Sequence, residues 1–143
     1  MAITKKITFF LFFIILFSSS SFAEPLKNLS EYNFFKDVRR QIPADNVIPY
    51  KIANPLFSDY SYKFRFVHIP ENKAAEYSYG NVFKFPIGTT IIKTFAYPID
   101  DRNLVKGFKL LETRLLIKNN SGWIPLSYIW NDEQTNASLK YTG

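Results

Sequence analysis

The sequence predicts a mainly β protein, built as an antiparallel β-sandwich or a barrel-like sheet with one N-terminal helix. Three observations support this prediction. Several segments alternate apolar and polar residues or are rich in β-branched and aromatic side chains, which favours strands. Turn-forming residues separate these segments at short intervals. One stretch, residues 31–40, instead spaces its apolar positions as a helix does.

The first 23 residues have the features of a secretory signal peptide. Lys5 and Lys6 form a positive beginning, residues 7–17 form an apolar run broken by one threonine, and Ala23 is the small residue before the expected cleavage site. We therefore expect the mature chain to begin at Glu24. A bilayer core needs roughly 20 apolar residues, so this run is too short for a permanent membrane anchor. The sequence thus predicts an exported protein, periplasmic or secreted.

The remaining residues, 24–143, are expected to form a single β-rich domain. The leader holds two of the 18 basic residues and none of the 12 acidic ones, so the rest of the chain has a mild positive excess. Because the basic residues are scattered, nucleic-acid binding is not expected. The chain has no cysteine, which excludes disulfides, a thiol nucleophile and C-x-x-C-H haem attachment within it. We therefore expect burial to hold the domain together, with the many aromatic side chains beyond residue 23 as its means.

The N-terminal part of the domain is predicted to hold the helix and an irregular passage. Ser30 is a suitable N-cap, Phe34 is placed to pack on Leu29, and Pro43 would end a helix over residues 31–40. Residues 42–60 contain three prolines but are too apolar for a disordered linker. We expect this passage to lie extended across the domain and to dock its side chains.

The strands are predicted from alternation and composition. They cover residues 62–68, 82–85, 89–97, 110–118 and 123–130, with a hairpin loop at 119–122 and the start of a further strand at 137–141. The segment 91–95 should be a central strand with Phe95 in the core. In the strand at 110–118, one face is predicted to carry Leu111, Thr113, Leu115 and Ile117, and the other face Glu112 and Arg114.

Three charged residues inside the two clearest strands form a candidate polar patch. Lys93 is flanked by apolar residues, while Glu112 and Arg114 share one strand face. Unpaired charges on half-buried strands are costly, so Glu112 is expected to bridge at least one of the two cations. A structural ion pair is the favoured interpretation, and a recognition surface is the alternative.

Enzymatic activity is not expected, because no catalytic motif is present. There is no G-x-S-x-G, H-E-x-x-H, P-loop or glycine-rich dinucleotide turn, and no residue is assigned to catalysis, cofactor binding or a metal. The single histidine, His68, is interpreted as a packed residue rather than a metal or haem ligand. The acidic pairs at 100–101 and 132–133 lack the frame of a calcium loop. A small hydrolase would require paired carboxylates about 5–10 Å apart in a cleft.

Four blocks, in order, resemble the N-terminal region of a family of exported bacterial proteins. They are LSEYNFF (29–35); VIPY (47–50) with NPLFSDY (54–60); FPIGTTIIKTF (85–95); and LETRLLI (111–117) with YIWNDEQTNA (128–137). Members of that family are described as diheme c-type cytochromes, or as uncharacterised proteins associated with parallel β-helix repeat proteins. A related module is fused to sugar-dehydrogenase-like domains. The family continues into a C-x-x-C-H segment that this chain lacks, so haem is expected only in a C-terminal continuation of a truncated or longer protein.

The resemblance implies a non-catalytic accessory domain of a c-type-cytochrome-like protein that docks a redox partner or a substrate. The expected partners are a periplasmic redox protein or a β-helix repeat protein. The alternative is a periplasmic carbohydrate-binding module linked to sugar oxidation, which would need Trp123 or Trp130 exposed for stacking on sugars. We take Asp59, Trp130, Asn131 and Asp132 as candidate recognition residues. Burial of the tryptophans in the core is the competing interpretation.

Overall fold

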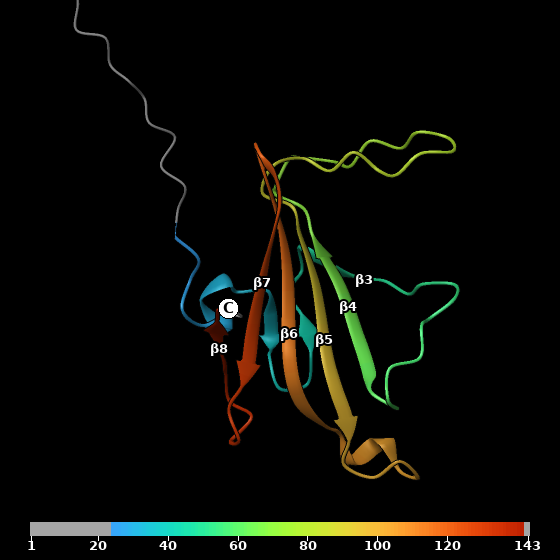
Figure 1. The fold of residues 1–143 in the computed structure, drawn as a ribbon, viewed down its shortest axis with the longest axis vertical. Coiled ribbons are helices and arrows are strands. Elements are labelled where there is room, and N and C mark those ends of the chain that lie inside the picture. The colour runs from blue at the N-terminus through green and yellow to red at the C-terminus, as the bar shows by residue number, and fades with distance from the viewer. Residues whose placement is uncertain (1–23, 142–143) are drawn as a thin grey trace, which may run out of the picture.

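The computed structural model describes residues 24–141, and the expected signal peptide lies outside them. Its main element is a six-stranded antiparallel sheet in which strands consecutive in sequence are neighbours (Figure 1). The strands are β3 (Val47–Pro49), β4 (Tyr62–His68), β5 (Thr90–Pro98), β6 (Phe108–Asn119), β7 (Gly122–Trp130) and β8 (Ala137–Lys140). The predicted mainly β, antiparallel class is confirmed. Within the described residues the sheet ends at β3 and β8 and does not close into a barrel.

A two-stranded sheet, β1 (Phe35–Asp37) and β2 (Ile42–Pro43), lies over one face of the large sheet. The ring of Phe35 packs edge-on against Phe66 of β4, with centroids 5.2 Å apart. Two short 3₁₀ helices, η1 (Leu29–Tyr32) and η2 (Leu104–Lys106), complete the elements of residues 24–141. In Figure 1, β1 and β2 lie behind the sheet. We call this covered side the inner face and the opposite side the outer face.

The prediction of a helix over residues 31–40 is wrong. The chain makes one 3₁₀ turn and leaves it at Asn33, which adopts a left-handed conformation with φ 54°. The carbonyl of Phe34 then accepts a hydrogen bond from the Ala44 backbone N–H, and the chain continues as a strand pair. An isolated helix of about ten residues is marginal. The aromatic side chains are better stabilised by packing on the sheet, so tertiary contacts override the local pattern.

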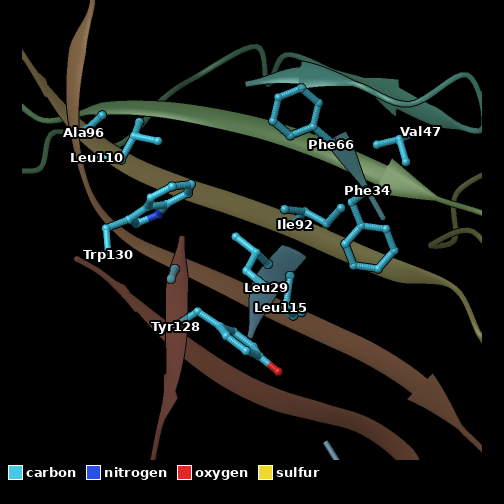
Figure 2. Packing of buried hydrophobic residues seen from close by; sticks show 11 residues of the cluster. Leu29, Phe34, Val47, Phe66, Ile92, Ala96, Leu110, Leu115, Tyr128 and Trp130 are labelled. Atoms are coloured by element: carbon cyan, nitrogen blue, oxygen red, sulfur yellow. The ribbon is translucent and has the colours of Figure 1, made fainter. Parts of the chain in front are cut away.

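The core fills the space between the inner face and the N-terminal segment (Figure 2). Ile92 of β5 and Leu115 of β6 are fully buried, and Leu29 of η1 packs in the same cluster. The cluster comprises Leu29, Phe34, Val47, Phe66, Ile92, Ala96, Leu110, Leu115, Tyr128, Trp130 and Ala137. Both ends of the described chain join this core, since β8 runs beside the segment that leads into η1 and Leu139 N–H donates to the Lys27 carbonyl at 2.8 Å.

A β-bulge between β5 and β6 changes which side chains face the core. The pairing shifts by one residue between Phe95 and Ala96, so Leu111 has no direct partner and Leu110 is the buried residue. The prediction placed Leu111 on one face with Thr113 and Leu115, which are buried, but Leu111 is only half-buried in the structure. The expectation that Phe95 is in the core is wrong. Strand alternation sends it to the outer face because Thr94 and Ala96, which are both fully buried, face inward.

The loops match the prediction in part. Asn119 pairs with Gly122, which confirms the hairpin with a two-residue loop. The prediction of a strand at 82–85 is wrong, because this segment forms only an isolated β-bridge, between Lys84 and Glu76. In the passage 42–60, Val47 docks in the core, whereas Leu56 remains exposed. Among residues 24–141, no helix has the length and apolar character needed to cross a membrane.

Candidate binding site on the outer face of the sheet

The three residues of the predicted polar patch lie together on the outer face. Lys93 on β5 is directly opposite Arg114 on β6, and Glu112 precedes Arg114 by two residues on the same strand. Arg114 donates two hydrogen bonds to Glu112, Nε to Oε1 at 2.8 Å and Nη2 to Oε2 at 2.9 Å. A bidentate pair of this kind fixes the guanidinium plane. The structure thus joins Glu112 to one of the two cations.

An aromatic ring and a hydroxyl hold the patch in place. The Nζ of Lys93 lies 4.7 Å from the ring centroid of Phe95, and the Cζ of Arg114 lies 4.9 Å from it. The hydroxyl of Ser127 on β7 donates to Glu112 Oε1. Contacts of a cation with an aromatic face are worth about 0.5–1 kcal/mol at exposed sites. The outward position of Phe95 therefore gives this ring a role in positioning both cations.

The electrostatic environment shifts the protonation equilibria of the patch. Hydrogen bonds from Arg114 lower the pKa of Glu112, helped by Ser127 and by the positive charges around it. The same contact raises the pKa of Arg114. Burial is the main cause that lowers the pKa of Lys93, and the nearby positive charges of Arg65, Lys63 and Arg114 lower it further. Lys93 therefore lies in surroundings that are mainly positively charged.

The cause of this crowding is a line of basic residues across the sheet. Arg65 pairs with Lys93, Lys93 with Arg114, Arg114 with Ser127, and Ser127 with Lys140. Directly opposite residues share a face, so five strands present one line of side chains on the outer face. We call Arg65, Lys93, Arg114 and Lys140 the basic row. Individually these residues look scattered in the sequence, and strand register brings them together.

A groove of about 820 Å³ lies over the basic row. Its lining includes all four residues of the row, together with Glu112 and Ser127. Apolar side chains from the next line of paired residues, Ile91, Leu116 and Pro125, form one wall. Two tyrosines, Tyr50 and Tyr141, also line it and are 37% and 80% exposed. The groove therefore offers positive charge, apolar surface and aromatic rings to a ligand.

Trp130, a candidate recognition residue, belongs to the core. It is 7% exposed, and its indole N–H donates to the hydroxyl of Thr113 at 3.0 Å. Thr113 in turn shares a hydrogen bond with Thr94. The ring is therefore not available for stacking on a sugar. Trp123, at 37% exposed, lies at the far end of the outer face, where it contacts Phe85 and Lys118.

The loop between β7 and β8 gives Asn131 a structural role. Its side-chain oxygen accepts from the Thr135 N–H at 2.9 Å, and its amide donates to the Thr135 hydroxyl at 2.8 Å. Asn136 in the same loop donates to Ser30 Oγ at 2.8 Å and so ties the loop to η1. Gln134, buried against Leu110, fixes the loop from the other side. Sequence reasoning missed these anchoring roles.

The other two candidate recognition residues are exposed and lie apart from the basic row. Asp132 is 3.9 Å from Lys109 in a solvent-exposed ion pair. Asp59 is in the loop between β3 and β4 with φ 40°. Neither residue lines the groove. The structure therefore brings Lys93, Glu112 and Arg114 together but does not bring the four recognition candidates to one site.

His68 and the acidic pairs show no arrangement for metal chemistry in the described residues. His68 packs against Phe34 with ring centroids 5.3 Å apart, and burial lowers the pKa of His68. Asp100 forms an ion pair with Lys106, with 2.8 Å between Oδ2 and Nζ. Across residues 24–141 no group of three or more His, Cys, Asp or Glu side chains could hold a metal ion. The chain also lacks the cysteines of a C-x-x-C-H haem motif.

Comparisons with protein-family models, with curated proteins and with solved structures found no match for this chain. Its candidate function therefore depends on the geometry of the outer face.

Proposed function

We propose that this chain is an exported, non-catalytic accessory domain that docks a redox partner or a substrate through the outer face of its sheet. The observation that carries the proposal is the groove over the basic row, where Arg114 and Lys93 are oriented by Glu112 and Phe95. Side chains that are fixed before binding lose less conformational entropy when a partner arrives. A positive surface also steers an acidic partner during encounter.

We propose further that the domain serves a c-type-cytochrome-like protein. Support comes from the four sequence blocks, one of which supplies Lys93 and another Glu112 and Arg114. The partner on this proposal is a haem protein with an acidic surface, or a β-helix repeat protein that accompanies it. The export that this role requires is supported by the features of the first 23 residues.

The test is retention of a haem protein by the immobilised domain. A periplasmic extract of the native host is passed over wild type, Lys93→Gln and a matched variant, Lys73→Gln, which removes an exposed cation in the loop between β4 and β5. A covalently bound haem stain on the eluted proteins should be present for wild type and Lys73→Gln and much weaker for Lys93→Gln. Equal retention by all three proteins, or no haem protein in any eluate, would contradict the role in serving a c-type-cytochrome-like protein.

A carbohydrate-binding role is the second candidate, and the two tyrosines of the groove favour it. Tyr50 and Tyr141 expose aromatic surface beside the polar side chains of the groove. Sugars are commonly bound by such combinations, because their C–H faces stack on rings while their hydroxyls form hydrogen bonds. On this alternative the domain delivers a sugar substrate for oxidation by an associated protein.

A further inference from the structure

We propose that the basic row binds a linear polysaccharide whose sugars carry carboxylates, with the glycan lying across the strands. This inference rests on the proposed function, because it names the chemistry of the substrate that docks on the outer face. The ligand would follow the line of Arg65, Lys93, Ser127 and Lys140, with Arg114 between them.

The first argument is the unbalanced charge of the row. Like charges directly opposite one another destabilise a sheet, yet Arg65, Lys93 and Arg114 occupy opposite positions on three neighbouring strands. The carboxylate beside them, Glu112, already accepts hydrogen bonds from Arg114 and Ser127. In the part of the chain that the structure describes, no ion pair within 4.0 Å engages Arg65 or Lys93. Anionic groups of a ligand would supply the missing countercharge.

The second argument is the spacing of the row. Neighbouring strands lie about 4.8 Å apart, so the row offers a side chain at about this interval across the sheet. One pyranose ring with its glycosidic oxygen has a similar length, so successive sugars of an extended glycan would meet successive strands. A peptide rises only about 3.3 Å per residue, so its residues do not keep the interval of the strands, whereas the sugar units do. This match in the length of one unit favours a glycan over an acidic peptide.

The third argument is the kind of surface around the charges. Tyr50 lies beside the start of the row, because its backbone N–H donates to the Arg65 carbonyl at 3.0 Å, and Tyr141 directly follows Lys140 at the other end. Two aromatic rings at the ends of a line of cations suit a chain of acidic sugars, because the sugar rings can stack on the tyrosines while the carboxylates pair with the cations. The hydroxyl of Ser127, within the row, lines the groove and can also accept a hydrogen bond from a sugar hydroxyl.

The experiment is calorimetric titration of the purified protein with an oligogalacturonate of about six sugars, enough to cross the five strands of the row. Lys93→Gln and Arg65→Gln are each expected to weaken binding about fivefold or more, and Lys73→Gln less than about twofold. Binding should weaken steadily with added salt, because exposed charges are screened. Melting curves of all variants, taken in the same buffer, exclude unfolding as the cause of any loss.

Four outcomes would overturn the inference. Polyglutamate of the same charge binding as tightly as oligogalacturonate would assign the row to an acidic protein partner. A neutral oligosaccharide of the same length binding equally well would remove the role of the cations. No titratable binding, or binding unaffected by Lys93→Gln and Arg65→Gln, would remove the site. The haem-protein retention experiment uses a different ligand, so the glycan titration can fail while retention by the basic row persists, and the two failures are distinguishable.

Discussion

At the residue scale, the outer face places Lys93 where its charge is disfavoured. Burial and three neighbouring cations lower the pKa of Lys93, and Glu112 offsets this effect only in part. A lysine whose pKa is lowered by folding destabilises the folded state while it is protonated. This cost begins to fall as the pH rises through the lowered, folded pKa and is gone only above the unfolded pKa. A charge that costs stability is easier to understand as a binding residue than as a structural one.

The first prediction is that Lys93→Gln makes the protein more stable. Removing the charge relieves repulsion from Arg65 and Arg114, at the cost of the contact with Phe95. We expect the free energy of unfolding to rise by about 0.5 kcal/mol at low ionic strength, where screening is weak. Urea unfolding at neutral pH, beside Lys73→Gln, measures this. A clear loss of stability in Lys93→Gln would mean that the lysine is a structural residue.

The second prediction concerns the pH dependence supplied by Glu112. Its pKa is lowered in the folded protein, chiefly by the hydrogen bonds from Arg114. The carboxylate therefore stabilises the fold fully above the unfolded pKa of about 4.3, and this contribution is lost as the pH falls through the lower, folded pKa. Glu112→Gln should be less stable than wild type by about 1 kcal/mol at pH 7, a value that allows for partial exposure of the pair to solvent.

The measurement is urea unfolding of wild type and Glu112→Gln from neutral to acid pH. The difference in the free energy of unfolding should shrink as the pH falls below about 4 and should vanish once both states of the wild type are protonated. A difference that persists unchanged in acid would mean that Glu112 acts by packing rather than by charge.

At the element scale, the loop between β7 and β8 supplies hydrogen bonds to a part of β6 that extends beyond its pairing with β7. The paired part of β6 and β7 begins at Glu112 and Ile129, so the backbone of Leu110 has no partner on β7. The side chain of Gln134 takes that place, because its Oε1 accepts from the Leu110 N–H and its Nε2 donates to the Leu110 carbonyl at 3.1 Å. One amide side chain thus substitutes for a strand partner in the core.

The third prediction is that Gln134→Ala is strongly destabilising. The substitution leaves two buried backbone groups of Leu110 without hydrogen bonds, and each unsatisfied group costs about 1–3 kcal/mol. We expect the free energy of unfolding to fall by about 3 kcal/mol, whereas the exposed neighbour Glu133→Ala should change it by less than about 0.5 kcal/mol. Denaturant unfolding gives both values. Faster hydrogen exchange at the Leu110 amide in the Gln134→Ala protein would locate the effect.

The elements also show where sequence patterns succeed and where they fail. The hairpin at 119–122 follows from local turn chemistry, so the sequence predicts it correctly. The segment 31–40 carries an equally local helix signal, but it holds the end of η1 and the strand β1, which pairs with β2. Its outcome depends on a distant contact, the packing of Phe35 on Phe66 of β4. Local patterns determine an element when no distant partner competes for the same side chains.

At the scale of the whole molecule, the two faces of the large sheet differ, because one packs in the core and the other presents the basic row. The inner face carries the core, to which both ends of the described chain contribute (Figure 2). The outer face carries the basic row and its groove. Because burial on one face holds the strands, substitutions on the other face can alter binding at little cost in stability. This separation makes the charge variants interpretable.

The fourth prediction is that the chain is processed and exported. Expressed with its first 23 residues in a bacterial host, the mature protein should be recovered from the periplasm or medium with Glu24 as its first residue. N-terminal sequencing of the fractionated protein measures this, and a variant with Lys5 and Lys6 replaced by glutamate should be exported less efficiently. Recovery of the wild type from the cytoplasm with Met1 retained would refute the export proposal.

The amino-acid sequence by itself determined the class of fold and most strands, because alternation and β-branched composition act over a few neighbouring residues. It also indicated Lys93, Glu112 and Arg114 as unusual charges within strands. The tertiary structure decided what such local patterns do not encode. Strand register aligned Arg65 and Lys140 with that patch, a bulge at Leu111 reset the buried positions of β6, and packing placed Trp130 inside. These outcomes depend on which strands become neighbours, and that is settled only when the whole sheet has buried its inner face.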